Sequence, residues 1–428
     1  MVTPRFYPAP LLSAVVAPLL FGCDVKDHTP TETGSDLGGA GAAGAGATCA
    51  RGAAVVSSDY LTSNVSLLGL DGEVAAPSLL SSGSAAAGLS LALGGDVALP
   101  TERARGGELV LLDRYPASVI TWVDLQTAEV PAQLSVATGF SANPHDYVRV
   151  SPTKAYVPRF EKNLDAGREQ FDQGNDVAIV DPSVPEITGR IDLTAAMDGE
   201  NARFLPRADR AVRVDDRVYV LLGSHSEDLL ESTDSRVVAI DTAADSLADL
   251  LVLSGLKGCA GLALSPAATE IAVSCSGAWE GDSVANVPEA GVVRVGLFPE
   301  FHEIQRYPAE SFSEGAVSTG ISYADATHLV FTAYGRFATE DLPAADDTLI
   351  ELDLNSEDFR VLLRSEETPF TLGDVRCDAP CGVCFAADAE RDGGVVHRFE
   401  VGTDGLSLDR SITLETSLGL PPRLLGWF

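Results

Sequence analysis

The chain has 428 residues, of which 45% are hydrophobic and 21% are charged, so it carries enough apolar material for a large folded core. Its formal net charge of −33 at pH 7 argues against nucleic-acid binding, because phosphates are neutralised by Lys and Arg. The same charge disfavours docking on anionic lipid, so any membrane attachment is expected through a lipid anchor alone.

The N-terminus has the organisation of a signal peptide. An apolar run over residues 11–20 is followed closely by Gly22 and Cys23. The run is too short to span a bilayer. A cysteine directly after such a run resembles the lipobox of bacterial lipoproteins, although Phe21 departs from the small or β-branched residue usual there. We predict a lipoprotein-type signal peptide over 1–22 and acylation of Cys23; ordinary secretion with cleavage elsewhere is the alternative.

A low-complexity segment follows. Residues 24–50 consist largely of Gly, Ala, Ser and Thr, and such a stretch cannot bury enough apolar surface to fold. We therefore predict an acylated cysteine with a flexible tether over 23–50 and a folded body over 51–428. This series predicts a lipid-anchored protein of the bacterial cell envelope, on its periplasmic side or outer surface.

Beyond residue 50 the sequence changes to short apolar runs rich in Val and Ile, which are cut by Gly, Asp and Pro as in strands and turns. One unit of strand, tight turn and strand recurs at spacings between 47 and 60 residues. Its turn positions are Asp71, Asp124, Asp181, Asp241, Gly296, Asp353 and Glu400. The turn Asp is expected to bind the turn backbone through its side chain. A second hairpin precedes most units, which makes four strands per repeat, as in a propeller blade.

The strongest single repeat is "PHDYVRVSPTKAYVPRF…NDVAIVDP" within residues 144–182. It resembles the YVTN family of bacterial surface β-propellers, and the resemblance covers most of residues 54–428. These motifs are generic to propellers, so the resemblance implies an all-β propeller fold and does not specify an activity.

The two ends of the repeat array predict how the ring closes. The first repeat lacks an innermost strand, and the chain ends in "PPRLLGWF", which has the pattern of an innermost strand without a following hairpin. We expect the C-terminal strand to complete blade 1, so that seven blades close and leave no open sheet edge.

Six cysteines remain after Cys23, and an even number in an exported protein favours disulfides. Two pairs flank hairpin turns in blades 5 and 7, and the third pair would join the tether to the blade 7 hairpin. The predicted disulfides are Cys259–Cys275, Cys377–Cys384 and Cys49–Cys381, of which the third rests on elimination among 15 connectivities.

The spacing C-x3-C-x2-C over residues 377–384 offers another interpretation. It matches the radical-SAM motif, but that family carries it near the start of a βα barrel in a reducing compartment. A c-type haem requires a His where Phe385 stands, and a zinc site would need a fourth ligand, for which His397 is the nearby candidate. We therefore expect no cofactor at these cysteines.

The connectivity of a four-stranded blade brings the loops between second and third strands to one face, together with the blade-to-blade connections. Long loops on a rigid scaffold often bind ligands. Four of these loops are long and together carry a charge of −10, namely 159–174, 223–235, 276–291 and 335–346. This acidic face is expected to favour cations, basic partners or Ca²⁺.

Candidate contact residues follow from position, with solvated loop residues as the alternative. His145 and Asp146 open the innermost strand of blade 3, so they should lie near the channel mouth. Four further candidates fall in the long loops, namely Arg159, His225, Trp279 and Arg336. Oxygen ligands for Ca²⁺ are offered, without EF-hand spacing, by Asp165, Asp172, Asn175 and Asp176.

The sequence contains no G-x-S-x-G elbow, no H-E-x-x-H and no Walker A motif. We therefore expect a non-catalytic binding or scaffold module, whose partner is an envelope protein, a peptide or a small ligand on the acidic loop face. The alternative is a Ca²⁺-dependent propeller hydrolase of lactonase type, whose metal ligands would be scattered in sequence. A third class, an accessory of a secreted redox system, would require bound metal or haem.

Overall fold

The computed structural model describes residues 48–428 with short gaps at 105, 281–283, 286, 314, 339, 341, 367–368, 391–392 and 415–417. The side chains of 279–280, 284–285 and 287 are also not described. The predicted signal peptide, Cys23 and most of the predicted tether lie outside the described residues. Within the described part, no helix is long and apolar enough to cross a membrane.

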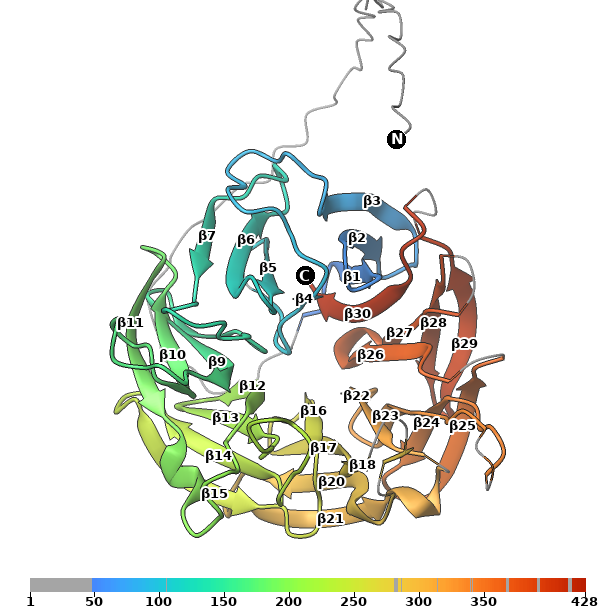
Figure 1. Ribbon diagram of the computed structural model, residues 1–428. Helices are drawn as coiled ribbons and strands as arrows, with labels where there is room; N and C mark the ends of the chain where they lie inside the picture. The colour runs from blue at the N-terminus through green and yellow to red at the C-terminus, as the bar shows by residue number, and fades with distance from the viewer. Residues whose placement is uncertain are drawn as a thin grey trace, which may run out of the picture. The chain divides into compact units, whose positions relative to one another are not determined.

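The described residues form seven four-stranded antiparallel sheets arranged around a central channel, which confirms the predicted propeller (Figure 1). From the centre outwards, blades 1 to 3 are β30(Pro422–Trp427), β1(Gly52–Ser58), β2(Ser63–Gly69), β3(Val74–Ser81); β4(Val97–Ala98), β5(Glu108–Asp113), β6(Val119–Asp124), β7(Ala132–Ser135); and β8(Val148–Ser151), β9(Lys154–Lys162), β10(Gly174–Asp181), β11(Glu186–Asp192). Blades 4 and 5 are β12(Ala208–Val214), β13(Arg217–Leu222), β14(Arg236–Asp241), β15(Ser246–Val252); and β16(Cys259–Leu264), β17(Glu270–Ser276), β20(Ala290–Gly296), β21(His302–Pro308). Blades 6 and 7 are β22(Val317–Tyr323), β23(His328–Ala333), β24(Thr348–Asp353), β25(Phe359–Arg364); and β26(Leu372–Asp378), β27(Val383–Asp388), β28(Val395–Gly402), β29(Gly405–Ile412).

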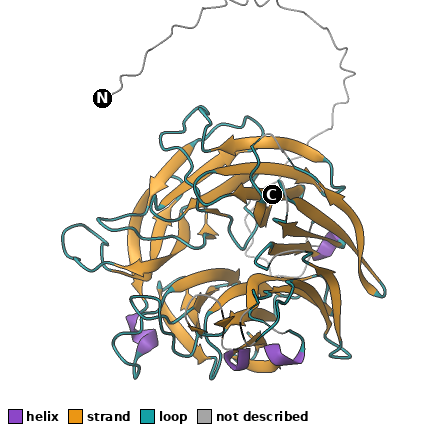
Figure 2. Ribbon diagram, turned by 45° about the vertical axis from the view of Figure 1, so that its right-hand side comes forward, coloured by secondary structure: helices purple, strands orange, loops and turns teal. Residues whose placement is uncertain are grey.

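Helical structure is confined to short turns at the ends of strands (Figure 2). Among the described residues these are η1(Thr194–Met197), η2(Val287–Glu289), η3(Ala309–Ser311) and η4(Ala379–Cys381). A small separate hairpin, β18(Trp279–Glu280) and β19(Val284–Ala285), projects from the loop between β17 and β20.

The C-terminal strand closes the ring as predicted. β30 pairs antiparallel with β1, from Ala53 opposite Trp427 to Ser57 opposite Pro422. It thereby becomes the innermost strand of a blade whose other three strands come from the start of the folded chain. The edge of β1 is paired, which removes a site for edge-to-edge association.

The hydrophobic core lies between the blades. Seven clusters of buried side chains form in the described chain, one between each pair of neighbouring blades. Inner strands are covered on both faces by the adjoining blades, so β1 is buried at every position, whereas outermost β15 is largely exposed. The near-continuous Val, Ile, Leu and Ala runs of the inner strands follow from this burial.

The turn aspartates have the structural role expected from the sequence. Asp124 accepts hydrogen bonds from the backbone N–H groups of Gln126 and Thr127, at 2.7 and 3.0 Å. Asp241 accepts in the same way from the two residues after Thr242. These backbone hydrogen bonds lower the pKa of both carboxyl groups. The turn acids are therefore part of the scaffold.

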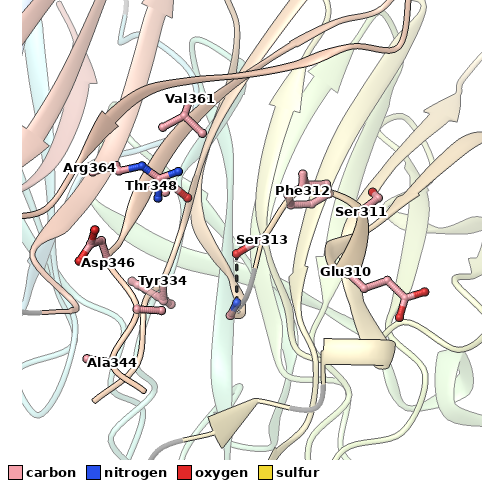
Figure 3. A pocket seen from close by; sticks show the side chains of 12 residues that line it. Glu310, Ser311, Phe312, Ser313, Tyr334, Ala344, Asp346, Thr348, Val361 and Arg364 are labelled. Atoms are coloured by element: carbon pink, nitrogen blue, oxygen red, sulfur yellow. Dashed lines mark hydrogen bonds between the residues drawn. The ribbon is translucent and has the colours of Figure 1, made fainter. Parts of the chain in front are cut away.

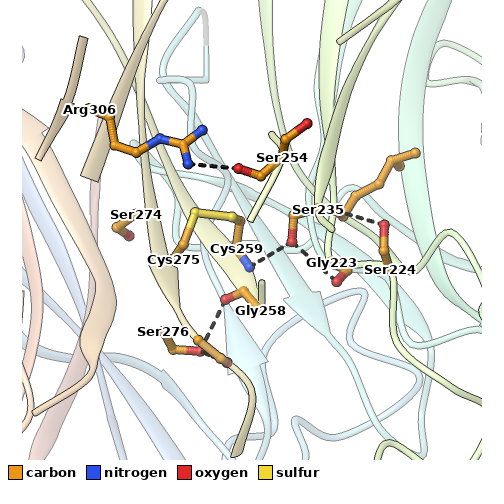
Figure 4. Close-up of a disulfide and its surroundings, with 12 residues drawn as sticks. Gly223, Ser224, Ser235, Ser254, Gly258, Cys259, Ser274, Cys275, Ser276 and Arg306 are labelled. Atoms are coloured by element: carbon orange, nitrogen blue, oxygen red, sulfur yellow. Dashed lines mark hydrogen bonds between the residues drawn. A yellow bond between two sulfur atoms is a disulfide. The ribbon is translucent and has the colours of Figure 1, made fainter. Parts of the chain in front are cut away.

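All three predicted disulfides are present. Cys259 and Cys275 are directly opposed on β16 and β17, and Cys377 and Cys384 on β26 and β27. Figure 4 shows the blade 5 disulfide, where the backbone N–H of Cys259 donates to Oγ of Ser235 in blade 4 at 3.1 Å. The third joins Cys49 to Cys381 across 332 residues of sequence.

The closing strand should contribute more to stability than an outer strand. Leu425 on β30 is 1% exposed and packs between blades 7 and 1, whereas Leu408 on β29 is 49% exposed. Leu425→Ala is expected to lower the free energy of unfolding by about 2–5 kcal/mol, because it leaves a cavity in the core. The control Leu408→Ala should change it by less than about 0.5 kcal/mol. Urea denaturation followed by tryptophan fluorescence measures both, and equal effects would contradict the proposed role of closure.

Candidate functional site

The central channel has a cavity at each end. The loop-face cavity, of about 500 Å³, is bordered by the starts of innermost strands and by the ends of second strands. The tip-face cavity, of about 750 Å³, is bordered by the opposite ends of innermost strands and by the short hairpin tips. Figure 3 shows a third cavity, of about 490 Å³, beside blade 6, which shares Tyr334 with the loop-face cavity.

A histidine and an aspartate from neighbouring blades meet at the loop-face cavity. His145 Nδ1 lies 3.0 Å from Asp209 Oδ1, and the two side chains are 12% and 11% exposed. The imidazole stacks on Phe160, with 4.3 Å between ring centroids. Burial disfavours the charged form of Asp209, but His145 and Arg210 more than offset this effect and lower the pKa of the carboxyl group. His145 lies at the channel mouth, as predicted.

Three arginines border the same cavity. Arg114 donates from Nε to Asp96 at 3.0 Å, so this pair is neutral. Arg210 donates from Nη1 to the carbonyl oxygen of Leu99 at 3.0 Å. Within the described chain, Arg423, on the closing strand, has only long hydrogen bonds to carbonyl oxygens, at 3.4 and 3.5 Å. The cavity wall thus carries cationic groups in a chain that is strongly acidic overall.

Aromatic side chains form part of the wall beside Arg423. The guanidinium carbon of Arg423 lies 5.4 Å from the centre of the Tyr60 ring. Tyr334 and Phe370 contact each other, with centroids 5.2 Å apart. Gly95 permits the placement of Tyr60, because a β-carbon on Gly95 would lie 2.3 Å from the Tyr60 carbonyl carbon. An apolar surface therefore lies next to a cation in this cavity.

Asp146 does not line the cavity, contrary to expectation, but is completely buried. It accepts hydrogen bonds from N and Oγ1 of Thr101, at 2.9 and 2.6 Å, and from the N–H of Ala211 at 2.8 Å. Thr101 follows β4 and Ala211 lies on β12, so this carboxylate ties together blades 2, 3 and 4. Its role is structural.

Arg159 was expected in a long loop, but it lies within β9, and the loop covers only 163–173. Its side chain is completely buried and donates from Nε and Nη2 to the two oxygens of Asp176, each at 2.7 Å. Asp176 lies directly opposite Arg159 on β10, so the ion pair joins the two neighbouring strands. Arg159 is therefore not exposed to a ligand.

The four oxygen donors suggested for Ca²⁺ have separate environments. Both carboxylate oxygens of Asp172 accept hydrogen bonds from backbone N–H groups of the loop. These hydrogen bonds, of which the one from Glu169 has the largest effect, lower the pKa of Asp172. Asp165 forms an exposed ion pair with Arg168, and Asp176 is bound by buried Arg159. The side-chain oxygen of Asn175 is buried without a hydrogen-bond partner.

No three carboxylates of the described chain bring their oxygens within 4.8 Å of one another. The one group of potential metal ligands at that distance is Cys49, Asp378 and Cys381. Its two sulfur atoms are joined in a disulfide, and Asp378 binds the backbone of Cys381 instead. Calcium binding thus remains a prediction from sequence without a matching cluster in this part of the chain.

The remaining candidates lie on the loops where they were predicted. His225 is half-buried, and burial, together with the charge of Arg207, lowers its pKa to about 4. Arg336 pairs through its backbone with Ala345 and donates from Nε to the carbonyl oxygen of Pro343. Trp279 is part of β18, but its side chain is outside the described part.

The acidic character of the loops is only partly neutralised. Glu161, Glu231 and Glu289 form ion pairs with Arg207, Arg203 and Lys257, respectively. Exposed acids such as Glu227 and Asp228 on the loop after β13 have no basic side chain within ion-pair distance in the described structure. The loops of this face therefore keep acids without ion-pair partners, while the wall of the loop-face cavity carries arginines.

The tip-face cavity is bordered by the start of the described chain. The N–H of Ala50 donates to Oδ2 of Asp378 at 2.5 Å, and Arg103 donates to the carbonyl oxygen of Thr48 at 3.3 Å. Thr48 and Ala50 both line this cavity. Together with the Cys49–Cys381 disulfide, these contacts fix residues 48–50 to the tip face.

No protein-family profile and no curated protein matches the chain. Among solved structures it is similar to the β-propeller domain of Myceliophteria thermophila Cps50 (Swd1), with a TM-score of 0.50 and 12% identity over 81% of this chain and 94% of that one. It is also similar to Kuenenia stuttgartiensis hydrazine synthase (TM-score 0.49, 12% identity, 86% and 97% covered) and to apo AztD from Citrobacter koseri (0.47, 16%, 86% and 83%). At these identities the likeness concerns the seven-bladed β-propeller fold alone.

Reasoning from sequence missed the most distinctive residues of the cavity, which are Asp209, Arg210, Arg423 and Tyr60. Asp209, Arg210 and Arg423 lie at the start of an innermost strand, and His145 lies three residues before one. Alignment of the seven repeats on that position would have indicated which side chains face the channel.

The free energy of unfolding should decrease as the pH is lowered, over a range set by the pKa of His225. Its pKa in the folded state, about 4, lies below its ordinary value of 6.5, so the unfolded state binds more protons between these values. The contribution of neutral His225 is complete above pH 6.5 and is lost as pH falls, at up to about 1.4 kcal/mol per pH unit. His225→Gln, which cannot titrate, should flatten the decline between pH 7 and pH 5. The exposed His302→Gln is the control, and an unchanged slope for His225→Gln would contradict the assignment.

Proposed function

We propose that the protein is a lipid-anchored β-propeller of YVTN type in the bacterial cell envelope, and that it is a non-catalytic binding module with the loop-face cavity as its ligand site. The observation that carries the proposal is this cavity of about 500 Å³, whose wall combines cationic and aromatic side chains. Its volume lies in the range of roughly 300–1,000 Å³ that is typical of small-molecule sites. Inner strands position the wall, and the long loops emerge on the same face of the ring.

Export is supported by the cysteines. Disulfides form and persist in oxidising compartments and are rare in the cytosol. All six cysteines of the described chain are paired, and the seventh, Cys23, stands in a lipobox-like sequence. This distribution supports export to an oxidising compartment with a lipid anchor at Cys23.

The attachment of residues 48–50 to the tip face sets where a chain from Cys23 would reach the ring. A lipid at Cys23 would be joined to the ring through a chain that meets it beside Cys381. Residues 48–50 line the tip-face cavity and not the loop-face cavity, so the loop face, with its cavity and its acidic loops, would be free to meet a ligand or a partner.

A Ca²⁺-dependent hydrolase of lactonase type is the second candidate. The His145–Asp209 pair favours it, because an imidazole oriented by a carboxylate can act as a general base. The pairing of Asp96 with Arg114 and of Asp374 with Arg376 disfavours it, because these carboxylates are already neutralised. Calcium-dependent turnover of lactones that is lost in Asp209→Asn would establish the hydrolase over the binding module.

The anchor is tested by the location of the protein in the bacterium. Cys23→Ala should move it from the membrane fraction to the soluble fraction after cell lysis, because the acylated residue is lost. Cys49→Ala with Cys381→Ala serves as the control and should leave it with membranes. A Cys23→Ala protein that is still processed and membrane-bound would contradict lipid anchoring.

The binding face is tested by photo-crosslinking in intact cells. A photoreactive residue at exposed Leu230 or Phe337, on two loops of the loop face, should yield the same adduct by mass spectrometry. The matched position is Val184, which is 61% exposed on a tip-face turn and should not yield that adduct. Equal yields at all three positions would contradict a specific loop-face site.

A further inference from the structure

Two guanidinium groups at the loop-face cavity keep hydrogen-bond donors that the protein does not use. Arg423 donates only to the carbonyl oxygens of Ser58 and Phe370, at 3.5 and 3.4 Å. Arg210 donates from Nη1, and its nearest carboxylate oxygen, on Asp209, lies 3.9 Å from Nε. Within the described chain, neither Nη2 atom has a hydrogen-bond acceptor, and neither is sealed in the interior.

The acids of the same wall are already paired. Asp96 is bound by Arg114, Asp209 by His145, and Asp374 by Arg376 at 3.1 Å. Arg423 has no carboxylate within ion-pair distance among the described residues. Three aspartates and three arginines line the cavity, and Arg423 is the arginine without a paired carboxylate in the described chain. Such a cation in a concave, partly desolvated site attracts an anion.

The surroundings of Arg423 also indicate the shape and polarity of a ligand that would bind there. Its guanidinium lies over the Tyr60 ring, and Phe370, whose carbonyl it contacts, packs on Tyr334. Tyr60 itself is 63% exposed, so a ligand can reach its ring. A group that fits has an apolar or aromatic body beside a planar anion, because Arg binds carboxylates in a fork geometry.

We infer that the loop-face cavity binds an organic carboxylate, whose anionic group is bound by Arg423 and whose apolar body lies on Tyr60 and Phe370. This inference rests on the proposed function, since it names the ligand class for the same cavity. Two sources share the chemistry: a free organic acid and the C-terminal carboxylate of a peptide. The acidic loops on the same face disfavour polyanions and favour a peptide with Lys or Arg before its last residue.

The test uses probes that differ only in charge. Calorimetric titration of the mature protein compares N-acetyl-phenylalanine with its amide, and the peptide acetyl-Lys-Lys-Phe with its C-terminal amide. Both free acids should bind more tightly than their amides, by about tenfold to a hundredfold, because a charge-assisted hydrogen bond is lost. Tighter binding of the Lys-Lys-Phe acid than of N-acetyl-phenylalanine would assign the source to a peptide terminus, and equal affinity would assign it to free acids.

Variants locate the interaction. Arg423→Gln should remove the difference between acid and amide, whereas Arg410→Gln, on the outer strand β29, should retain it. Since Arg423 lies on the closing strand, the exposed Tyr60→Ala provides a second variant, which should weaken both acid and amide without affecting folding. Thermal unfolding is recorded for each variant.

The outcomes separate the inference from the proposed function. Equal affinity of acid and amide, or a difference that survives in Arg423→Gln, overturns the carboxylate assignment. If neither acid binds while Leu230 and Phe337 still yield the common adduct, the ligand class is wrong and the binding module stands. If neither the titration nor the crosslinking detects a ligand, both are wrong.

Discussion

The pairing of β30 with β1 is the constraint on which the rest of the structure depends. Each sheet of the ring can bury both faces only when it has a neighbour on each side, and the sheet of blade 1 is built from the two ends of the folded chain. Without its last strand, blade 1 would lose its innermost element and the cluster that it shares with blade 7. The same strand brings Arg423 to the loop-face cavity. Closure therefore fixes both the scaffold and one wall of the candidate site.

Buried carboxylates are a second recurrent device, and they explain part of the acidic composition. Asp347, at the start of blade 6's third strand, accepts backbone N–H groups of Gly335, Phe370 and Leu372 at 2.6, 2.9 and 3.0 Å. Asp146 does the same between blades 2, 3 and 4. Where blades converge, backbone N–H groups lack strand partners and must be bound by something else. A carboxylate satisfies several of them at once, so these acids connect blades and do not mark a ligand.

The features that could be predicted from sequence depend on local periodicity. Strand alternation, turn residues and repeat length were sufficient for the number of blades and for the closing strand. Because blade hairpins have regular register, positions on either side of a turn also indicated that Cys259 faces Cys275 and that Cys377 faces Cys384. The third disulfide followed only by elimination, since no local pattern relates Cys49 to Cys381.

The candidate site was less predictable, because the environment of a charged residue depends on the neighbouring strand or blade. Arg159 has the sequence context of a loop residue, yet Asp176 on the adjacent strand and the wall of blade 2 enclose it. His145 and Asp146 are consecutive, but one borders the cavity and the other is buried beneath it. Their environments are set by the neighbouring blades, since Asp209 of blade 4 binds His145 while backbone groups of blades 2 and 4 bind Asp146.

The distribution of charge decides what the cavity can bind, and the net charge alone is a poor guide to it. A sum over the long loops indicated a preference for cations, because it counted every acid as free. In the structure, turn acids bind their own turns, blade-connecting acids bind backbone, and several loop acids bind arginines. Once these are assigned to their partners, the least satisfied charge at the channel mouth is a cation, Arg423. Arg423 thus favours an anion whereas the loops of the same face favour a cation, and a molecule with an anionic end and a basic or neutral remainder suits both.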